Sequence, residues 1–123
     1  MQQVSDYELE LMKTIWAMGG TAMYAEIVTG LEAKGNSFTK NTMLTLLSRL
    51  IEKGILKTSK TGRRNIYTAI VSESEYQADQ TVRFLDKIYE GSTKGLVATL
   101  IAKNLLTKSE YNDLQKQWDG GDD

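Results

Sequence analysis

The chain has 123 residues, of which 41% are hydrophobic and 25% are charged, so it is long enough and apolar enough to fold around a buried core. It contains neither cysteine nor histidine, which excludes disulfides, thiolate metal sites and catalysis by a thiol or an imidazole. It has no run of roughly 18 apolar residues, as a membrane span requires, and its first residues lack the pattern of a signal peptide. We therefore expect a cytoplasmic protein without a cofactor.

The net charge of −1 hides a strong asymmetry along the chain. Residues 34–67 carry eight bases and one acid, a net charge of +7, whereas residues 1–33 and residues 68–123 each carry a net charge of −4. A basic segment between acidic ones is typical of a surface that binds a polyanion such as DNA. A charged run alone is equally typical of a solvated surface, so the neighbouring elements have to decide between the two interpretations.

Two helices are predicted before the basic segment. Ser5 and Glu8 have the spacing of a capping box, apolar residues follow at intervals of three and four, and Gly19-Gly20 ends the helix. Thr21 is expected to cap a second helix, in which Gly30 lowers the helix propensity.

A third, strongly amphipathic helix is predicted between a cap at Thr39 and a stop at Gly54. Its apolar residues fall within one stripe at helical spacing: Met43, Leu46, Leu47, Leu50 and Ile51. The polar residues lie on the opposite face and its flank: Asn41, Thr42, Thr45, Ser48, Arg49 and Glu52.

Two short strands follow, Ile55–Ser59 and Arg64–Ala69, which are rich in Ile, Thr and Tyr. They are expected to form a basic hairpin whose connection, through Thr61-Gly62, is longer than a two-residue turn. Three helices followed by a basic hairpin indicate a winged helix-turn-helix.

The third helix and the hairpin together suit DNA. Asn41 can pair with adenine in the major groove, and Thr42 or Thr45 offers a hydroxyl or a methyl group. Four bases are expected to neutralise phosphates or to reach the minor groove: Lys40, Lys60, Arg63 and Arg64. Taken alone, these small polar residues also fit an ordinary solvated helix face, and the adjacent basic hairpin makes us favour DNA.

The last third of the chain predicts three more amphipathic helices. The first spans about Ser74 to Glu90, and the last follows a second capping box at Thr107 and Glu110, before a solvated tail at 119–123. Their apolar faces either fold back on the same chain or pair with a second copy, which we favour because a two-fold dimer matches palindromic DNA. The residues assigned to the dimer interface are Phe84, Leu85, Ile88, Leu96, Val97, Leu100, Ile101, Leu114 and Trp118.

Five stretches carry a family resemblance: SDYELELMKTIW, FTKNTMLTLLSRLIEKG, GRRNIYTAIVSESEY, KIYEGSTKGLVATLI and LTKSEYNDLQKQW. In order and spacing they resemble the corresponding stretches of the BlaI/MecI family, the penicillinase and methicillin-resistance repressors. The resemblance covers nearly the whole chain and implies a dimeric winged-helix repressor of a palindromic operator. It places the recognition helix at Thr39, Asn41, Thr42, Thr45 and Arg49, and the wing from Lys60 to Asn65.

The chain departs from that family pattern in several places. Members commonly have Trp-Ser-Pro-Lys-Thr at the start of the recognition helix, where this chain has residues 38–42, Phe-Thr-Lys-Asn-Thr, and Leu44 stands where members are often polar. The preferred operator is therefore expected to differ. In the family, a sensor-triggered protease cuts an Asn-Phe bond that corresponds to Thr99-Leu100 here, and this change weakens the case for a β-lactam circuit and a sensor protease. The cysteine pairs of copper-responsive relatives are missing.

An enzyme and a protein-binding winged helix are the rival classes. The chain has no phosphate-binding loop, no dinucleotide-binding glycine motif and no calcium loop, and Glu73 and Glu75 are typical of the acidic start of a helix. We predict a mostly α protein with a small β-hairpin wing: a winged helix-turn-helix at 1–71 and a helical dimerisation region at 72–123. Its predicted function is a non-enzymatic DNA-binding repressor that an unassigned signal releases, and the alternative is a winged helix that binds another protein.

Overall fold

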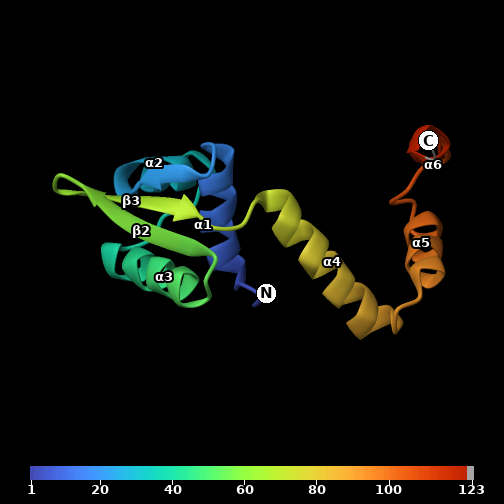
Figure 1. The fold of residues 1–123 in the computed structure, drawn as a ribbon, viewed down its shortest axis with the longest axis horizontal. Coiled ribbons are helices and arrows are strands. Elements are labelled where there is room, and N and C mark those ends of the chain that lie inside the picture. The colour runs from blue at the N-terminus through green and yellow to red at the C-terminus, as the bar shows by residue number, and fades with distance from the viewer. Residues whose placement is uncertain (122–123) are drawn as a thin grey trace. The chain divides into compact units, whose positions relative to one another are not determined.

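The structure, a computed structural model, describes residues 1–121, which form six helices and three strands (Figure 1). In chain order they are α1 (Asp6–Ala17), β1 (Thr21–Met23), α2 (Tyr24–Ala33), α3 (Lys40–Glu52), β2 (Leu56–Thr61), β3 (Arg64–Ala69), α4 (Glu73–Tyr89), α5 (Thr93–Ala102) and α6 (Lys108–Gly121). The chain forms two compact units, Met1–Gln80 and the residues from Thr81 onward. No helix in the described part of the chain is long and apolar enough to cross a membrane.

α1 begins and ends where the sequence predicts. The Glu8 amide donates to Ser5 Oγ at 3.2 Å, and the Ser5 amide donates to Glu8 Oε1 at 3.2 Å, which completes the capping box. Gly19 and Gly20 have φ of 89° and 93°, in the left-handed region that an α-helix cannot continue through.

The segment between α1 and α2 differs from the prediction. Thr21 does not cap a helix, because residues 21–23 form β1, which pairs antiparallel with β3 and places Ala22 opposite Tyr67. α2 begins at Tyr24, and the Glu26 carboxylate accepts a hydrogen bond from the Met23 amide at 2.8 Å. A three-residue strand is too short to show an alternating pattern, and its pairing partner lies far along the chain, so local sequence favoured the helix.

α3 has the predicted cap and stop. Thr39 Oγ1 accepts from the Thr42 amide at 3.2 Å, and Gly54 follows the helix with φ of 73°. Ile51 departs from the prediction, because it lies at the edge of the stripe in the last turn and is 36% exposed. The other four stripe residues are buried: Met43, Leu46, Leu47 and Leu50.

The three strands form one antiparallel sheet in the order β1-β3-β2, and the β2–β3 hairpin is the wing. Thr61 pairs with Arg64, so the connection is the two-residue turn Gly62-Arg63, and the prediction of a longer connection is wrong. Gly62 has φ of 65°, as glycine allows at the first central position of such a turn. The predicted first strand was too short because residues 57–61 are exposed and show no apolar alternation.

The core of the N-terminal unit lies between α1, α2, α3 and the sheet. The start of α4 is part of it: Tyr76 is buried, its hydroxyl accepts from the Val4 amide at 3.1 Å, and its ring lies 5.8 Å from the ring of Trp16. Trp16 Nε1 also donates to the Val71 carbonyl at 3.0 Å. The compact unit thus runs through the start of α4, while the functional division at residues 71 and 72 stays a prediction.

The C-terminal unit contains the second half of α4, then α5 and α6. The second capping box is present, since the Glu110 amide donates to Thr107 Oγ1 at 3.1 Å and the Thr107 amide donates to Glu110 Oε1 at 2.9 Å. α6 continues to Gly121, so the predicted tail is wrong for residues 119–121, and residues 122–123 lie outside the described residues.

Candidate nucleic-acid interface

The outer face of α3 carries small polar side chains. Asn41, Thr45 and Ser48 are all exposed and follow one another at helical spacing. Thr45 Oγ1 donates to the Asn41 carbonyl at 2.9 Å, which holds the threonine hydroxyl against the helix. Within residues 1–121 the Asn41 side-chain amide has no hydrogen-bond partner, so its donor and acceptor are both available to a ligand.

The two threonines at the start of α3 are bound to each other. Besides accepting from the Thr42 amide, Thr39 Oγ1 donates to Thr42 Oγ1 at 3.0 Å. Their hydroxyls therefore stabilise the first turn of the helix. A ligand that contacted them would bind a pair of hydroxyls whose orientation is already set by this hydrogen bond. Arg49 is also exposed, and it lies on the same flank of α3 as Thr42.

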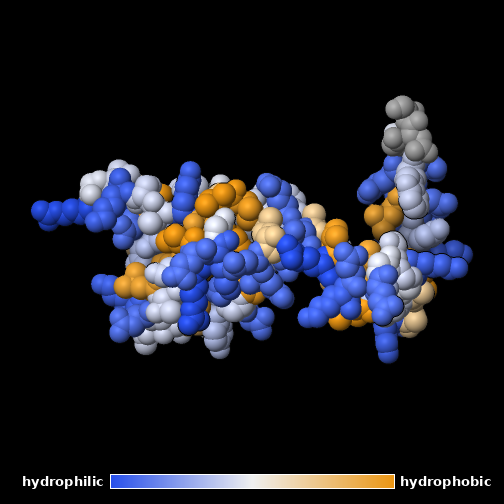
Figure 2. Space-filling view, turned by 60° about the horizontal axis from the view of Figure 1, so that its bottom comes forward, coloured by the Kyte–Doolittle hydropathy of each residue, from blue (hydrophilic) through white to orange (hydrophobic). Residues whose placement is uncertain are grey.

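The wing brings the predicted basic residues together at its tip. Lys60 pairs with Asn65 across the hairpin, Thr61 pairs with Arg64, and Arg63 occupies the turn. All of residues 60–65 are exposed, and the tip is the hydrophilic projection at the left of Figure 2. The tip contains no carboxylate, so its cationic charge is not neutralised locally.

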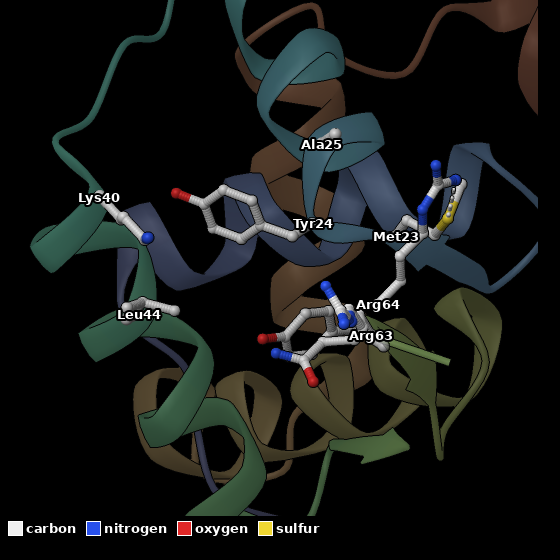
Figure 3. Close-up of a pocket in the computed structure, with 9 residues that line it drawn as sticks. Met23, Tyr24, Ala25, Lys40, Leu44, Arg63 and Arg64 are labelled. Carbon is white, nitrogen blue, oxygen red and sulfur yellow. Dashed lines mark hydrogen bonds between the residues drawn. The ribbon is translucent and has the colours of Figure 1, made fainter. Parts of the chain in front are cut away.

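A surface hollow of about 470 Å³ separates α3 from the wing, and we call it the α3–wing hollow. Nine residues from four elements line it: Met23, Tyr24, Ala25, Lys40, Leu44, Arg63, Arg64, Asn65 and Tyr67. In Figure 3 the ring of Tyr24 extends from the start of α2 toward Lys40, and Leu44 lies one turn further along α3. Arg64 reaches back to β1, with its Nη1 3.8 Å from the Met23 sulfur. Three cations and no acid thus line the hollow.

Not every base of the +7 segment is available to a ligand. The Lys53 ammonium donates to both carboxylate oxygens of Glu8, at 2.8 and 2.9 Å, and to the Gln3 carbonyl at 3.2 Å. Burial works against the charge of Glu8, but hydrogen bonds from Lys53 and Ser5 outweigh it and hold the pKa of Glu8 below its ordinary value. Through its contacts with Glu8, Lys53 anchors the end of α3 to α1. Lys34 also has a partner within the chain, since it donates to Thr14 Oγ1 at 3.0 Å.

The basic residues assigned to DNA contacts lie at the surface, but the hollow between them was not predicted from the sequence. Tyr24 is the first residue of α2, directly after β1, a strand that was not predicted from the sequence. Burial, the largest influence, raises the pKa of the neighbouring Tyr67 hydroxyl, so this group stays a neutral hydrogen-bonding group. Among residues 1–121, no cluster of three acidic side chains could hold a metal ion.

Known proteins are similar to this chain over most of its length. Residues 4–120 match the sequence model of the family described as Penicillinase repressor. The chain is 35% identical over 112 residues to the penicillinase repressor of Bacillus licheniformis, an alignment that covers 91% of this chain and 86% of that protein. It is 27% identical over 113 residues to the methicillin resistance regulatory protein MecI of Staphylococcus aureus strain N315, covering 92% and 90%.

A solved structure is similar to part of this chain. It is the solution structure of the Bacillus licheniformis BlaI monomeric form in complex with the blaP half-operator, with a TM-score of 0.51 and 40% sequence identity. The similarity covers 61% of this chain and 89% of that chain.

Proposed function

Because the chain belongs to the penicillinase repressor family, the BlaI/MecI family that its sequence resembles, we propose that it represses transcription by binding a palindromic operator as a homodimer. One observation carries this proposal: α3 exposes small polar side chains next to a basic wing, with a cation-lined hollow between them. A flat surface for a protein partner would not need uncompensated cations on both sides of one helix.

In the proposed complex α3 lies in the major groove. Asn41 reads a base edge with its free amide, Thr45 presents its methyl group, and the Thr39–Thr42 pair holds the first turn against the backbone. The contacts to phosphates and to the minor groove come from the flank of α3 and from the wing: Lys40, Arg49, Lys60, Arg63, Arg64 and Asn65.

A second copy of the chain is proposed to cover the C-terminal helices. α5 contains no buried residue, and residues 108–120 of α6 are all exposed. Hydrophobic side chains therefore lie at the surface of this unit, as Figure 2 shows in orange among the blue. Large exposed apolar surfaces are rare on monomers and mark interfaces. The proposed interface residues are Phe84, Leu85, Ile88, Leu96, Val97, Leu100, Ile101, Leu114 and Trp118.

The bond that corresponds to the family's cleavage site lies inside a helix. The Thr99 carbonyl accepts from the Lys103 amide at 3.0 Å, and the Leu100 carbonyl accepts from the Leu105 amide at 2.8 Å. We propose that proteolytic cleavage at this bond requires α5 to open first, since a protease needs an exposed and locally unfolded segment.

Salt-dependent binding of duplex DNA tests the repressor function. The full chain selects its own target from a pool of random duplexes, and its affinity for that target is then measured against salt. The log–log slope is expected to be about −0.9 per neutralised phosphate, and replacing both Arg63 and Arg64 with Ala should weaken binding and flatten the slope. Lys116→Ala, in the exposed part of α6, is the matched control and should leave the slope unchanged.

Failure of the chain to select or bind any duplex would contradict the proposal. That result would favour the rival function, a winged helix whose surface binds another protein. A chain that binds DNA with a slope unaffected by the Arg63 and Arg64 changes would retain the repressor function but lose the assignment of the wing.

A further inference from the structure

We propose that the α3–wing hollow seats the sugar-phosphate strand that separates the two grooves, and that the Tyr24 hydroxyl donates a hydrogen bond to one of its phosphates. This inference rests on the proposed function and adds to it a contact outside the recognition helix and the wing. It gives the hollow one occupant, a strand of duplex DNA.

The arrangement of the elements leads to this occupant. If α3 enters the major groove and the tip of the wing reaches the adjacent minor groove, the backbone strand between those grooves has to cross the space between the two elements. That space is the hollow, whose walls are Lys40 and Leu44 on one side and Arg63 and Arg64 on the other. The walls supply positive charge without any carboxylate among the nine lining residues, as a phosphate requires.

Tyr24 lines this hollow, and its ring packs against the core. The ring is half-buried, while the hydroxyl end extends toward Lys40 (Figure 3). A phenol is a hydrogen-bond donor that stays neutral near pH 7, and tyrosine is among the side chains that contact DNA phosphates. A pre-positioned hydroxyl beside a lysine therefore offers a phosphate one neutral and one charged donor.

The basic residues of the hollow differ in how firmly they are held. The Arg64 guanidinium contacts the Met23 sulfur at 3.8 Å, which directs it along β1, whereas Arg63 lies in the turn and Lys40 in the first turn of α3. The contact at Tyr24 is consequently expected to be the least dependent on side-chain rearrangement. Since it carries no charge, it strengthens binding equally at every salt concentration.

The test combines removal of the Tyr24 hydroxyl with replacement of single DNA phosphates by uncharged methylphosphonates. The affinity of the full chain is measured for the duplex that it selected from a random pool. It is also measured for a series of duplexes of the same sequence, in each of which a different single phosphate is replaced by a methylphosphonate. Tyr24→Phe keeps the ring and should lower the affinity for the unmodified duplex about tenfold, as expected for one hydrogen bond to a charged acceptor. The salt slope should not change, whereas Lys40→Gln should flatten it by about 0.9.

The same variant should also lose its sensitivity at one position. A methylphosphonate at the phosphate in the hollow should weaken the wild type markedly and Tyr24→Phe much less, because the hydrogen bond that it removes is already absent. Tyr7→Phe is the matched control: its ring packs edge-on against Phe38, 5.2 Å away, outside the hollow, and it should behave like the wild type throughout. Circular dichroism and thermal unfolding should be the same for all variants.

Two results would overturn the proposal in distinguishable ways. If Tyr24→Phe binds as tightly as the wild type, or stays as sensitive as the wild type at every methylphosphonate position, the hollow does not seat the strand, and the repressor function stands. If the wild type selects no duplex at all, the proposed function itself fails and this inference fails with it.

Discussion

The two units of the chain use apolar residues in opposite ways. In Met1–Gln80 many hydrophobic side chains form a buried core, and Leu50 in the last turn of α3 is 0% exposed. Among residues 81–120 no hydrophobic residue is buried, and Trp118 is 78% exposed. The first unit has a core of its own and can hold a reading surface in a fixed geometry. The second has amphipathic helices whose apolar side chains lie at the surface, which supports the proposal that a second copy covers them.

The largest expected effect concerns the ion pairs of the two units. Lys53→Met removes the partner of the Glu8 carboxylate, whose side chain is only 2% exposed, and should lower the free energy of unfolding by about 3–5 kcal/mol. In the C-terminal unit, Lys116 lies 3.8 Å from Asp113 with both side chains mostly exposed, so Lys116→Met should have no measurable effect. Urea unfolding of both variants, monitored by circular dichroism, checks the difference.

A second comparison sets a buried residue against an exposed one. Leu50→Ala should destabilise the N-terminal unit by about 2–5 kcal/mol at any protein concentration. Trp118→Ala should change stability only where copies associate, so its effect should grow with protein concentration. Unfolding curves at several concentrations distinguish the two. Equal, concentration-independent losses would mean that the C-terminal helices pack within one chain.

Two helical glycines, one in each unit, differ in the space around them. A Cβ added at Gly30 in α2 would lie 2.6 Å from Thr14 Cγ2 and 2.9 Å from Met18 Cε, both on or next to α1. Gly30→Ala should therefore destabilise by about 1–3 kcal/mol in spite of the better helix propensity of alanine. A Cβ at Gly120 in α6 meets nothing within 4 Å, so Gly120→Ala should be neutral or slightly stabilising. Thermal unfolding measures both variants.

The smallest expected effect is a pH dependence confined to the N-terminal unit. The folded chain lowers the pKa of Glu8 below its ordinary value of 4.5, so the unfolded chain binds the proton more tightly. The stability due to this carboxylate is fully present above about pH 4.5 and is lost as pH falls through the lowered, folded pKa. Glu8→Gln removes the titrating group and should show a smaller loss on acidification.

The tryptophans allow this acid response to be assigned to one unit. The chain has two, Trp16 in the first unit and Trp118 in the second, so a Trp118→Phe background leaves a fluorescence signal from the N-terminal unit alone. In that background Glu110→Gln should leave the acid response unchanged, because Glu110 caps α6. An acid response unaffected by Glu8→Gln would contradict the role given to the Glu8–Lys53 pair.

Features that depend on residues close together in the sequence could be predicted, whereas features that depend on distant residues could not. The capping boxes at Ser5 and Thr107, and the cap of α3 at Thr39, join residues three positions apart, and all three are present. β1 was missed because its partner strand is distant in sequence, and local propensity favoured a helix at Thr21. The tight turn at Gly62-Arg63 was missed because the strand residues before it are solvated on both faces.

At the candidate site, too, the features set by local sequence could be predicted and those set by distant residues could not. Its exposed polar face and basic wing could be predicted from helical spacing and local charge, as Asn41 and Arg63 show. Lys53 was counted with the basic segment, but its actual partner, Glu8, lies on another helix. The hollow depends on four elements meeting around Tyr24, which no pattern along one segment can indicate.

Sedimentation equilibrium of the full chain tests whether a second copy covers the helices from Thr81 onward. The wild type should be a dimer at micromolar concentration. Ile101→Lys places a charge on an exposed apolar side chain of α5, so it should shift the chain to monomer while the circular dichroism spectrum and operator half-site binding persist. A wild type that sediments as a monomer throughout the micromolar range, or an Ile101→Lys chain that dimerises equally well, would show that these helices do not form the proposed dimer interface.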